Sequence, residues 1–191
     1  KTMARITALG NFWFTPVTTG LENIKRDKPV LFVGNHTIFG VSDWPLILNE
    51  IYQERNIFVR SLGDKLHYTI PVWRDYVSTF GVVEGTRENC ALLMENGEHV
   101  MVYPGGAREV CKRRDEKYTL TWKKRTGFVS MAIQHGYPIM PFASVGPEDA
   151  WDILLDADDI EQSPLAGLLE RTGLSDGLLR ENDIIPPLCR G

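Results

Sequence analysis

Pro29-Val30-Leu31-Phe32-Val33-Gly34-Asn35-His36 is the stretch that decides the expected fold of this chain. Its apolar residues form a short run that a proline enters and Gly-Asn leaves, a pattern typical of a strand buried on both faces. From Asp43 onward, apolar residues recur at helical spacing, with Asp43 placed as N-cap and Pro45 in the first turn. We therefore expect a buried strand, a loop that carries His36, and a helix.

The same unit of strand and helix repeats along the chain. Four more strands are expected, at 57–60, 82–83, 99–103 and 139–145. Three more helices are expected, at 73–80, 86–94 and 126–135. Such alternation predicts an α/β fold with a mainly parallel central sheet and helices on both faces. Functional side chains are then expected in the loops beyond the carboxyl ends of the strands.

Length and composition favour an ordinary folded domain. The 191 residues are 43% hydrophobic and 24% charged, which excludes a disordered or fibrous chain. We predict a single domain over residues 1–191, with a core at about 20–152 and a tail at 153–191 that is acidic and contains Pro and Gly. The tail is expected to be a surface excursion with short helices. Because the chain starts at Lys1 and stops at Gly191, we expect it to be truncated at both ends.

Charge and cysteine content narrow the classes of partner. A formal net charge of −4 argues against a nucleic-acid partner. The spacings of Cys90, Cys111 and Cys189 match no zinc pattern, so reduced thiols are expected. The scattered histidines offer no metal site either.

The first polar cluster, Asn35-His36 with Asp43, follows the first expected strand. A carboxylate seven positions after the histidine can hold Nδ1 and leave Nε2 to take a proton from a hydroxyl. This arrangement predicts a general base. Alternatively, His36 is an ordinary loop residue and Asp43 only caps the helix.

The second polar cluster is Gly81-Val82-Val83-Glu84-Gly85-Thr86-Arg87-Glu88-Asn89, where Arg87 lies in the first turn of a helix that Thr86 caps. Backbone N–H groups at a helix N-terminus, together with a guanidinium, suit phosphate or carboxylate oxygens. Alternatively, Arg87 pairs on the surface with Glu84 or Glu88.

The third polar cluster is Tyr103-Pro104-Gly105-Gly106-Ala107-Arg108-Glu109. Two glycines that adopt a positive φ would let backbone N–H groups face an oxyanion, although a plain turn is the alternative. The chain has no Gly-x-Ser-x-Gly elbow, no nucleotide-binding glycine loop and no Cys-x-x-Cys pair. A base without a serine nucleophile suits direct transfer to a hydroxyl from an activated donor such as an acyl thioester.

These three clusters, with Tyr137-Pro138-Ile139-Met140-Pro141 as a fourth block, resemble the motifs of the lysophospholipid (glycerolipid) acyltransferase superfamily. The similarity runs from about Gly20 to Asp152. It is strongest to the branch of monoacylglycerol and diacylglycerol acyltransferases and the related phytyl ester synthases.

The resemblance implies an enzyme that moves a fatty acyl group from acyl-CoA or acyl-carrier protein (acyl-ACP) to a hydroxyl of a glycerolipid or other neutral lipid alcohol. His36 is then the base, acting without a covalent intermediate, and Asp43 orients it. No cofactor is expected. The implied substrate-binding residues are Glu84, Gly85, Thr86, Arg87, Tyr103, Pro104, Gly105, Gly106, Arg108 and Glu109.

Two departures from the family pattern bear on these roles. Six residues separate His36 from Asp43, whereas the first motif usually has four between them. Gly105 stands where the third motif commonly has glutamate, and Glu109 is the nearest replacement. The missing glutamate favours a neutral acceptor over a glycerol phosphate.

Two segments suggest peripheral contact with a membrane. Residues 112–125 hold seven basic and two acidic residues interleaved with aromatic ones, and Phe12-Trp13-Phe14 lies near the start of the chain. The alternatives are a solvated basic loop and a buried aromatic plug. We expect membrane association on the cytoplasmic face, with any anchor outside this chain. A noncatalytic lipid-binding module and a thioester or ester hydrolase remain alternative functions.

Overall fold

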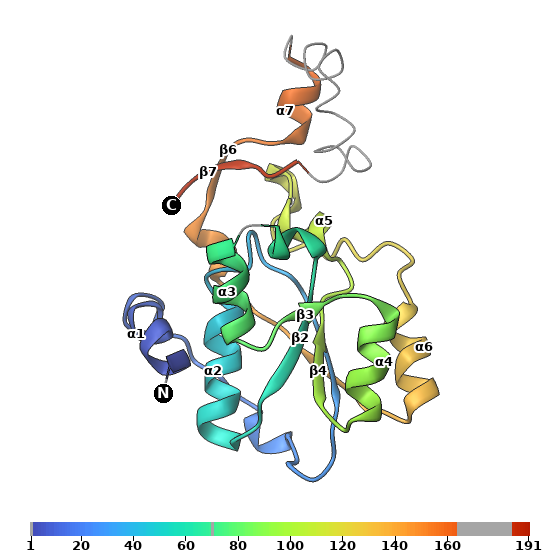
Figure 1. The fold of residues 1–191 in the computed structure, drawn as a ribbon. Helices are drawn as coiled ribbons and strands as arrows, with labels where there is room; N and C mark the ends of the chain where they lie inside the picture. Colours follow the sequence, from blue (N-terminus) through green and yellow to red (C-terminus); the bar gives the residue numbers. More distant parts are fainter. Residues whose placement is uncertain (1, 70, 164–184) are drawn as a thin grey trace. The chain divides into compact units, whose positions relative to one another are not determined.

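The computed structural model describes residues 2–69, 71–163 and 185–191 (Figure 1). The strands are β1 (Leu31–Gly34), β2 (Val59–Gly63), β3 (Val83–Glu84), β4 (His99–Val102), β5 (Ile139–Phe142), β6 (Asp152–Leu155) and β7 (Leu188–Arg190). The α-helices are α1 (Thr2–Phe14), α2 (Trp44–Arg55), α3 (Pro71–Thr79), α4 (Arg87–Glu95), α5 (Ala107–Val110), α6 (Gly127–His135) and α7 (Ala157–Glu161).

Strands β1 to β5 form one parallel sheet in the order β3-β2-β4-β1-β5. Leu31 of β1 lies opposite Val100 of β4 and opposite Ile139 of β5. β1 therefore has a neighbour on each side, and all four of its residues are buried. The predicted α/β fold with a mainly parallel sheet is confirmed.

Helices cover both faces of this sheet. α2 and α3 lie on one side, and α4 and α6 lie on the other (Figure 1). Right-handed crossovers explain this division, because the connections from β1 and β2 lead toward β3 whereas those from β3 and β4 lead toward β5. The direction changes between the neighbouring strands β1 and β4. At such a point, α/β sheets bind ligands beyond the carboxyl ends of their strands.

Local side chains set the limits of the helices. Asp43 accepts a hydrogen bond of 2.8 Å from the N–H of Trp44 at the start of α2. The hydroxyl of Thr86 accepts one of 3.0 Å from the N–H of Asn89 in α4. Gly136, with a φ of +67°, ends α6. The predicted starts of α2 and α4 and the predicted end of α6 are therefore confirmed.

The observed strands differ from the sequence-based limits by one residue at β3 and β4 and by more at β2 and β5. β2 is Val59–Gly63 rather than 57–60, and β5 ends at Phe142 rather than at 145. Hydrogen-bonded neighbours set these limits, since β2 begins its pairing with β4 at Val59 and pairs with β3 through Gly63. The local apolar pattern carries no information about neighbours.

Helix α1, the short helix α5 and a second sheet were not expected from the sequence. α1 covers Thr2–Phe14, and β6 pairs with β7 in an antiparallel sheet that sets Asp152 opposite Arg190. The two partners are far apart along the chain, so no short pattern reveals their pairing. α7 is a short helix, as predicted for the tail. The predicted tail also includes 164–184, which lie outside the described residues.

The chain divides into two compact units. Unit 1 comprises residues 1–34, 41–104 and 124–143 and holds the parallel sheet. Unit 2 comprises residues 35–40, 105–123 and 144–191 and holds α5, α7 and the β6-β7 pair. The chain passes into unit 2 shortly after β1, β4 and β5, three neighbouring strands. The single domain over 1–191 stays a prediction.

Candidate functional site

His36 lies in unit 2, two residues beyond the end of β1. The side chain of Asn35 donates to the carbonyl of Ser144 and accepts from its N–H, both at 2.9 Å. At the other end of this loop, the N–H of Phe39 donates to the carbonyl of Val110 at 3.3 Å. Both ends of the loop 35–40 are therefore fixed within unit 2.

The imidazole of His36 contacts its own loop. Its Nδ1 lies 3.0 Å from the carbonyl oxygen of Thr37. A carbonyl only accepts, so this contact is a hydrogen bond when Nδ1 carries the proton, and Nε2 then holds the lone pair of the neutral ring. Gly40, with a φ of +64°, lies against the ring, where a Cβ would overlap Cε1. The loop thus provides a ring with the chemistry of a base. Thr37 and Gly40 were not predicted as site residues.

Glu109 of α5 anchors the backbone at His36. Its Oε2 accepts a hydrogen bond of 2.9 Å from the N–H of His36 and one of 3.2 Å from the indole N–H of Trp122. Its Oε1 accepts from the N–H of Thr121 at 3.3 Å. The side chain is fully buried, with a relative exposure of 0%. Sequence reasoning named Glu109 but did not reveal these partners.

The two predicted glycines play different parts. Gly106 has a φ of +54°, in the region that favours glycine, and it precedes α5. Gly105 does not have such a φ; instead, a Cβ at this position would overlap the carboxylate of Glu109. Of the two glycines that can adopt a positive φ, only Gly106 does so, whereas the missing side chain of Gly105 makes room for Glu109.

Arg108 is held inside unit 2. It is buried, its guanidinium pairs with the carboxylate of Glu116, and it also donates to the carbonyl of Cys111 at 3.3 Å. Burial alone would raise the pKa of Glu116, but the hydrogen bonds and charge of Arg108 and Arg113 lower it below its ordinary value. A contact of Arg108 with substrate stays a prediction.

Asp43 and Tyr103 lie in unit 1. Asp43 is buried at 7% exposure and caps α2. The phenol of Tyr103 donates to the sulfur of Met101 at 3.3 Å and meets the ring of Phe142 edge to face. Burial, followed by the Asp43 carboxylate, raises the pKa of Tyr103 well above its ordinary value. Because His36 belongs to the other unit, its contact with Asp43 stays a prediction.

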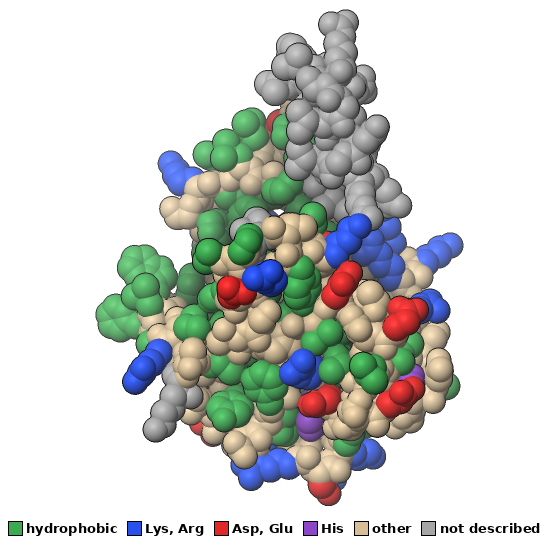
Figure 2. Space-filling model, in the orientation of Figure 1, with side chains coloured by type: hydrophobic (Ala, Val, Ile, Leu, Met, Phe, Trp, Pro, Cys, Tyr) green, Lys and Arg blue, Asp and Glu red, His purple; other side chains and the backbone are tan. Residues whose placement is uncertain are grey.

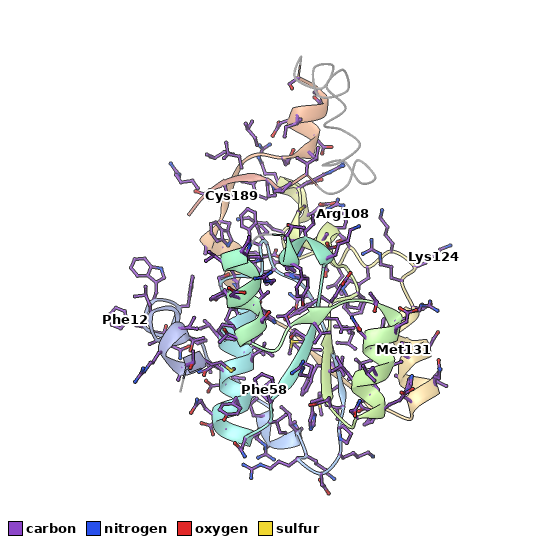
Figure 3. All side chains as sticks on the ribbon, in the orientation of Figure 1. Phe12, Phe58, Arg108, Lys124, Met131 and Cys189 are labelled. Carbon is purple, nitrogen blue, oxygen red and sulfur yellow. The ribbon has the colours of Figure 1, made fainter. Side chains whose placement is uncertain are left out.

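A pocket of about 220 Å³ opens in unit 1 beside the starts of α4 and α6. Its lining is formed by Leu62, Gly85, Thr86, Arg87, Cys90, Val102, Pro104, Arg125, Gly127, Phe128 and Met131. Four predicted site residues thus come together here, namely Gly85, Thr86, Arg87 and Pro104. Met131 on α6 can be located in Figure 3. The predicted Glu84 is not part of the lining, and its backbone carbonyl accepts from the side chain of Asn89 at 2.9 Å.

The pocket combines cationic groups with an apolar floor. Among the described residues, no carboxylate forms an ion pair with Arg87, so the alternative pairing with Glu84 or Glu88 is not formed. Its guanidinium instead lies beside Gly127. Arg125, which was not predicted as a site residue, donates to the carbonyl of Pro104 at 3.2 Å. Such a lining suits an anionic group attached to an apolar chain.

The comparisons with known proteins agree with the motifs. A protein-family model described as Acyltransferase matches residues 16–145. The chain belongs to the acyltransferase family. Phytyl ester synthase 2, chloroplastic, of Arabidopsis thaliana is 34% identical over 175 residues, covering 87% of this chain and 25% of that protein. The DGAT1/2-independent enzyme synthesizing storage lipids of Homo sapiens is 29% identical, covering 68% of this chain and 39% of that protein.

A solved structure supports the same fold. The 1-acyl-sn-glycerophosphate (LPA) acyltransferase PlsC of Thermotoga maritima matches with a TM-score of 0.55 at 24% identity, covering 78% of this chain and 59% of that one. This likeness shows the fold alone. The predicted family resemblance is confirmed, and the acyltransferase chain spans about a quarter of the length of the phytyl ester synthase it matches.

The predicted basic segment 112–125 of this acyltransferase is only partly open to solvent. Lys112 forms a buried ion pair of 2.5 Å with Glu148, and Arg113 and Arg114 pair with Asp158 and Asp159. The acidic residues 147–162 therefore neutralise the first three cations of the segment within unit 2. Lys112 is buried and therefore not available to an anionic membrane surface, whereas Arg113 and Arg114 form more exposed pairs.

The aromatic residues of α1 are exposed. The relative exposure is 79% for Phe12 and 76% for Trp13, so the alternative of a buried aromatic plug is wrong. Figure 3 shows Phe12 directed away from α2, and hydrophobic side chains gather over α1 in Figure 2. None of the described helices has the length and hydropathy that a membrane span requires.

Proposed function

We propose that this chain catalyses transfer of a fatty acyl group from an acyl-CoA or acyl-ACP thioester to a hydroxyl of a glycerolipid or other neutral lipid alcohol. The observation that supports this proposal most directly is the loop of His36. In a chain of the acyltransferase family, this loop sets Nδ1 of the imidazole beside the carbonyl of Thr37. The names of the relatives mention phytyl esters and storage lipids, which favours a neutral product.

In the proposed reaction, Nε2 of His36 takes the proton of the acceptor hydroxyl. The oxygen attacks the thioester carbonyl carbon, the C–S bond breaks as the new C–O bond forms, and the thiolate leaves. The imidazolium then returns its proton to the thiolate, so atoms and charges balance without an acyl-enzyme. Burial raises the pKa of Cys90 in the pocket, which keeps it a protonated thiol and disfavours it as a nucleophile.

The pocket in unit 1 is proposed to hold a phosphate of the thioester donor. CoA and the carrier-protein prosthetic group are anionic, whereas the proposed acceptor is neutral. The guanidinium of Arg87 and the backbone N–H groups at the start of α4 offer donors to phosphate oxygens. Gly85, Thr86 and Pro104 contribute the walls of the same pocket.

Peripheral membrane contact through α1 is proposed as well, since a lipid acceptor resides in a membrane. Along its described length the helix exposes Leu9, Phe12 and Trp13, and Arg5 is its single charged residue. Large aromatic side chains favour the boundary between headgroups and acyl chains.

An assay of products tests the proposed function. Labelled acyl-CoA or acyl-ACP is incubated with the chain, diacylglycerol, phytol or lysophosphatidic acid, and ester, free fatty acid and unreacted donor are separated. Ester formation supports transfer; free fatty acid alone indicates a hydrolase, and bound but unreacted lipid indicates a binding module. His36→Ala is expected to lower turnover by about 10² to 10⁴, the usual contribution of a placed base. The control His135→Gln alters a histidine at the end of α6 and should keep full turnover.

A further inference from the structure

We propose that Glu109 is the positioning residue of His36, with its carboxylate occupying the space of the glutamate that the third motif commonly carries at position 105. This inference rests on the proposed function, in which His36 is the base. Gly105 and Glu109 then act together. Gly105 lacks a side chain, so the carboxylate of Glu109 can reach the backbone N–H of His36.

The hydrogen bonds of Glu109 support a positioning role. Its carboxylate receives N–H groups from His36, Thr121 and Trp122, at 2.9, 3.3 and 3.2 Å. Those donors come from two segments of unit 2, the loop 35–40 and the segment after Lys117. One side chain therefore ties the residue that bears the imidazole to a second loop.

All three partners of the Glu109 carboxylate are N–H donors. An ionised carboxylate only accepts hydrogen bonds, so it matches this environment, whereas an amide would turn its own N–H groups toward at least one of the donors. Hydrogen bonds to a charged acceptor are also stronger than neutral ones. A glutamine at this position should therefore loosen the loop even though its shape is nearly the same.

The charge of Glu109 has no cationic partner among the described residues. A buried carboxylate without an ion pair is costly to maintain. By contrast, the buried Glu148 of the same unit pairs with Lys112, as expected of a structural carboxylate. What sets Glu109 apart from the other buried carboxylates is its hydrogen bond to the backbone N–H of the proposed base, which favours a positioning role.

The geometry at Gly105 links the two positions. A Cβ at residue 105 would overlap the Cγ, Cδ and Oε2 atoms of Glu109. The φ of Gly105 lies outside the region that excludes side chains, so Glu109, rather than the backbone conformation, is what forbids one. Removing the Glu109 side chain should therefore free space for a side chain at 105.

Three variants of the chain test this inference by acyl-transfer kinetics and by hydrogen exchange of the peptide that covers 35–40. Glu109→Gln should lower kcat by about tenfold or more, as a misplaced base would, while KM for the donor changes less than about twofold. Exchange of the His36 peptide should become faster. The double variant Gly105→Glu/Glu109→Ala, which moves the carboxylate to the usual motif position, should recover most of the lost kcat and protection.

Asp156→Asn is the matched control. Asp156 is a buried carboxylate of unit 2 that also accepts three backbone N–H groups, from Arg114, Asp158 and Asp159. The Asp156→Asn substitution should leave kcat and the hydrogen exchange of residues 35–40 unchanged. Wild-type kcat and exchange in a folded Glu109→Gln protein, or equal losses in Asp156→Asn, would overturn the inference. If the unaltered chain forms no ester, the proposed function fails, and hydrogen exchange still decides whether Glu109 holds the loop.

Discussion

Gly40 lies directly against the imidazole of His36. A Cβ at this position would overlap Cε1 of the ring and stand 3.0 Å from Nδ1. Its φ of +64° is also one that side chains rarely adopt. Two independent physical reasons therefore require glycine at position 40, and one of them acts on the proposed base.

Gly40→Ala should destabilise the protein by about 1 to 2 kcal/mol through the positive φ, and it should also displace the His36 ring and lower acyl transfer. Denaturant unfolding and kcat are the two measurements. Gly97→Ala is a matched control, because Gly97 has a φ of +72° with nothing near its Cβ position. Equal stability losses with equal kcat in the two variants would contradict a special contact with His36.

Substitutions of Asp43 distinguish its role as the N-cap of α2 from its predicted role in orienting His36. Asp43→Ala should cost about 1 kcal/mol by removing the N-cap of α2, whereas Asp43→Asn keeps an acceptor for the Trp44 N–H and should be nearly neutral. If Asp43 also orients His36, both variants lose turnover, since an amide lacks the charge that stabilises an imidazolium. Full turnover in a folded Asp43→Asn protein argues that the side chain serves only as a cap.

Arg87 should affect donors that carry phosphate. Arg87→Ala is expected to raise KM for acyl-CoA by about tenfold, the value of one charge-assisted hydrogen bond. KM for an acyl-pantetheine, which lacks phosphate, should be unchanged. Arg74→Ala, which removes an exposed arginine paired with Asp75 on α3, serves as the control. A similar rise for both donors would place the role of Arg87 elsewhere than at a phosphate.

The exposed face of α1 should govern membrane binding. Phe12→Ala with Trp13→Ala should reduce cosedimentation with phosphatidylcholine and phosphatidylglycerol vesicles, while unfolding changes by less than about 0.5 kcal/mol because both side chains are exposed. Val72→Ala, an exposed apolar residue on α3, controls for general loss of apolar surface. Undiminished sedimentation of the double variant would exclude α1 as the membrane contact.

His99 should make stability depend on pH. Burial lowers its pKa from the ordinary 6.5, although contacts with Arg26 and Glu98 oppose this effect. The unfolded chain therefore takes up a proton before the folded one does, so the contribution is fully present above pH 6.5 and declines as pH falls toward the folded pKa. His99→Asn should flatten this part of the curve of unfolding free energy against pH. An unchanged curve would assign the dependence to other groups.

Local patterns were enough to predict that the five strands of the parallel sheet alternate along the chain with helices α2, α3, α4 and α6, but not to predict α1. β1 is buried along its whole length, so its apolar run predicted a strand without knowledge of its neighbours in the sheet. The N-caps of α2 and α4 could also be predicted, because Asp43 and Thr86 accept hydrogen bonds from N–H groups one and three residues away. His36 and Arg87 stood out as polar residues that follow predicted strands.

Tertiary structure decided which side chains meet. Glu109 reaches the N–H of His36 from a position 73 residues away, and the pocket in unit 1 is lined both by Arg87 of α4 and by Arg125, which precedes α6. Likewise, Glu148, Asp158 and Asp159 pair with the cations at 112–114, which the sequence alone presented as part of a basic segment. Helix and strand signals arise from interactions between near neighbours in the chain. Contacts between distant side chains depend on the order of strands in the sheet and on the paths of the loops, and no short stretch of sequence encodes either.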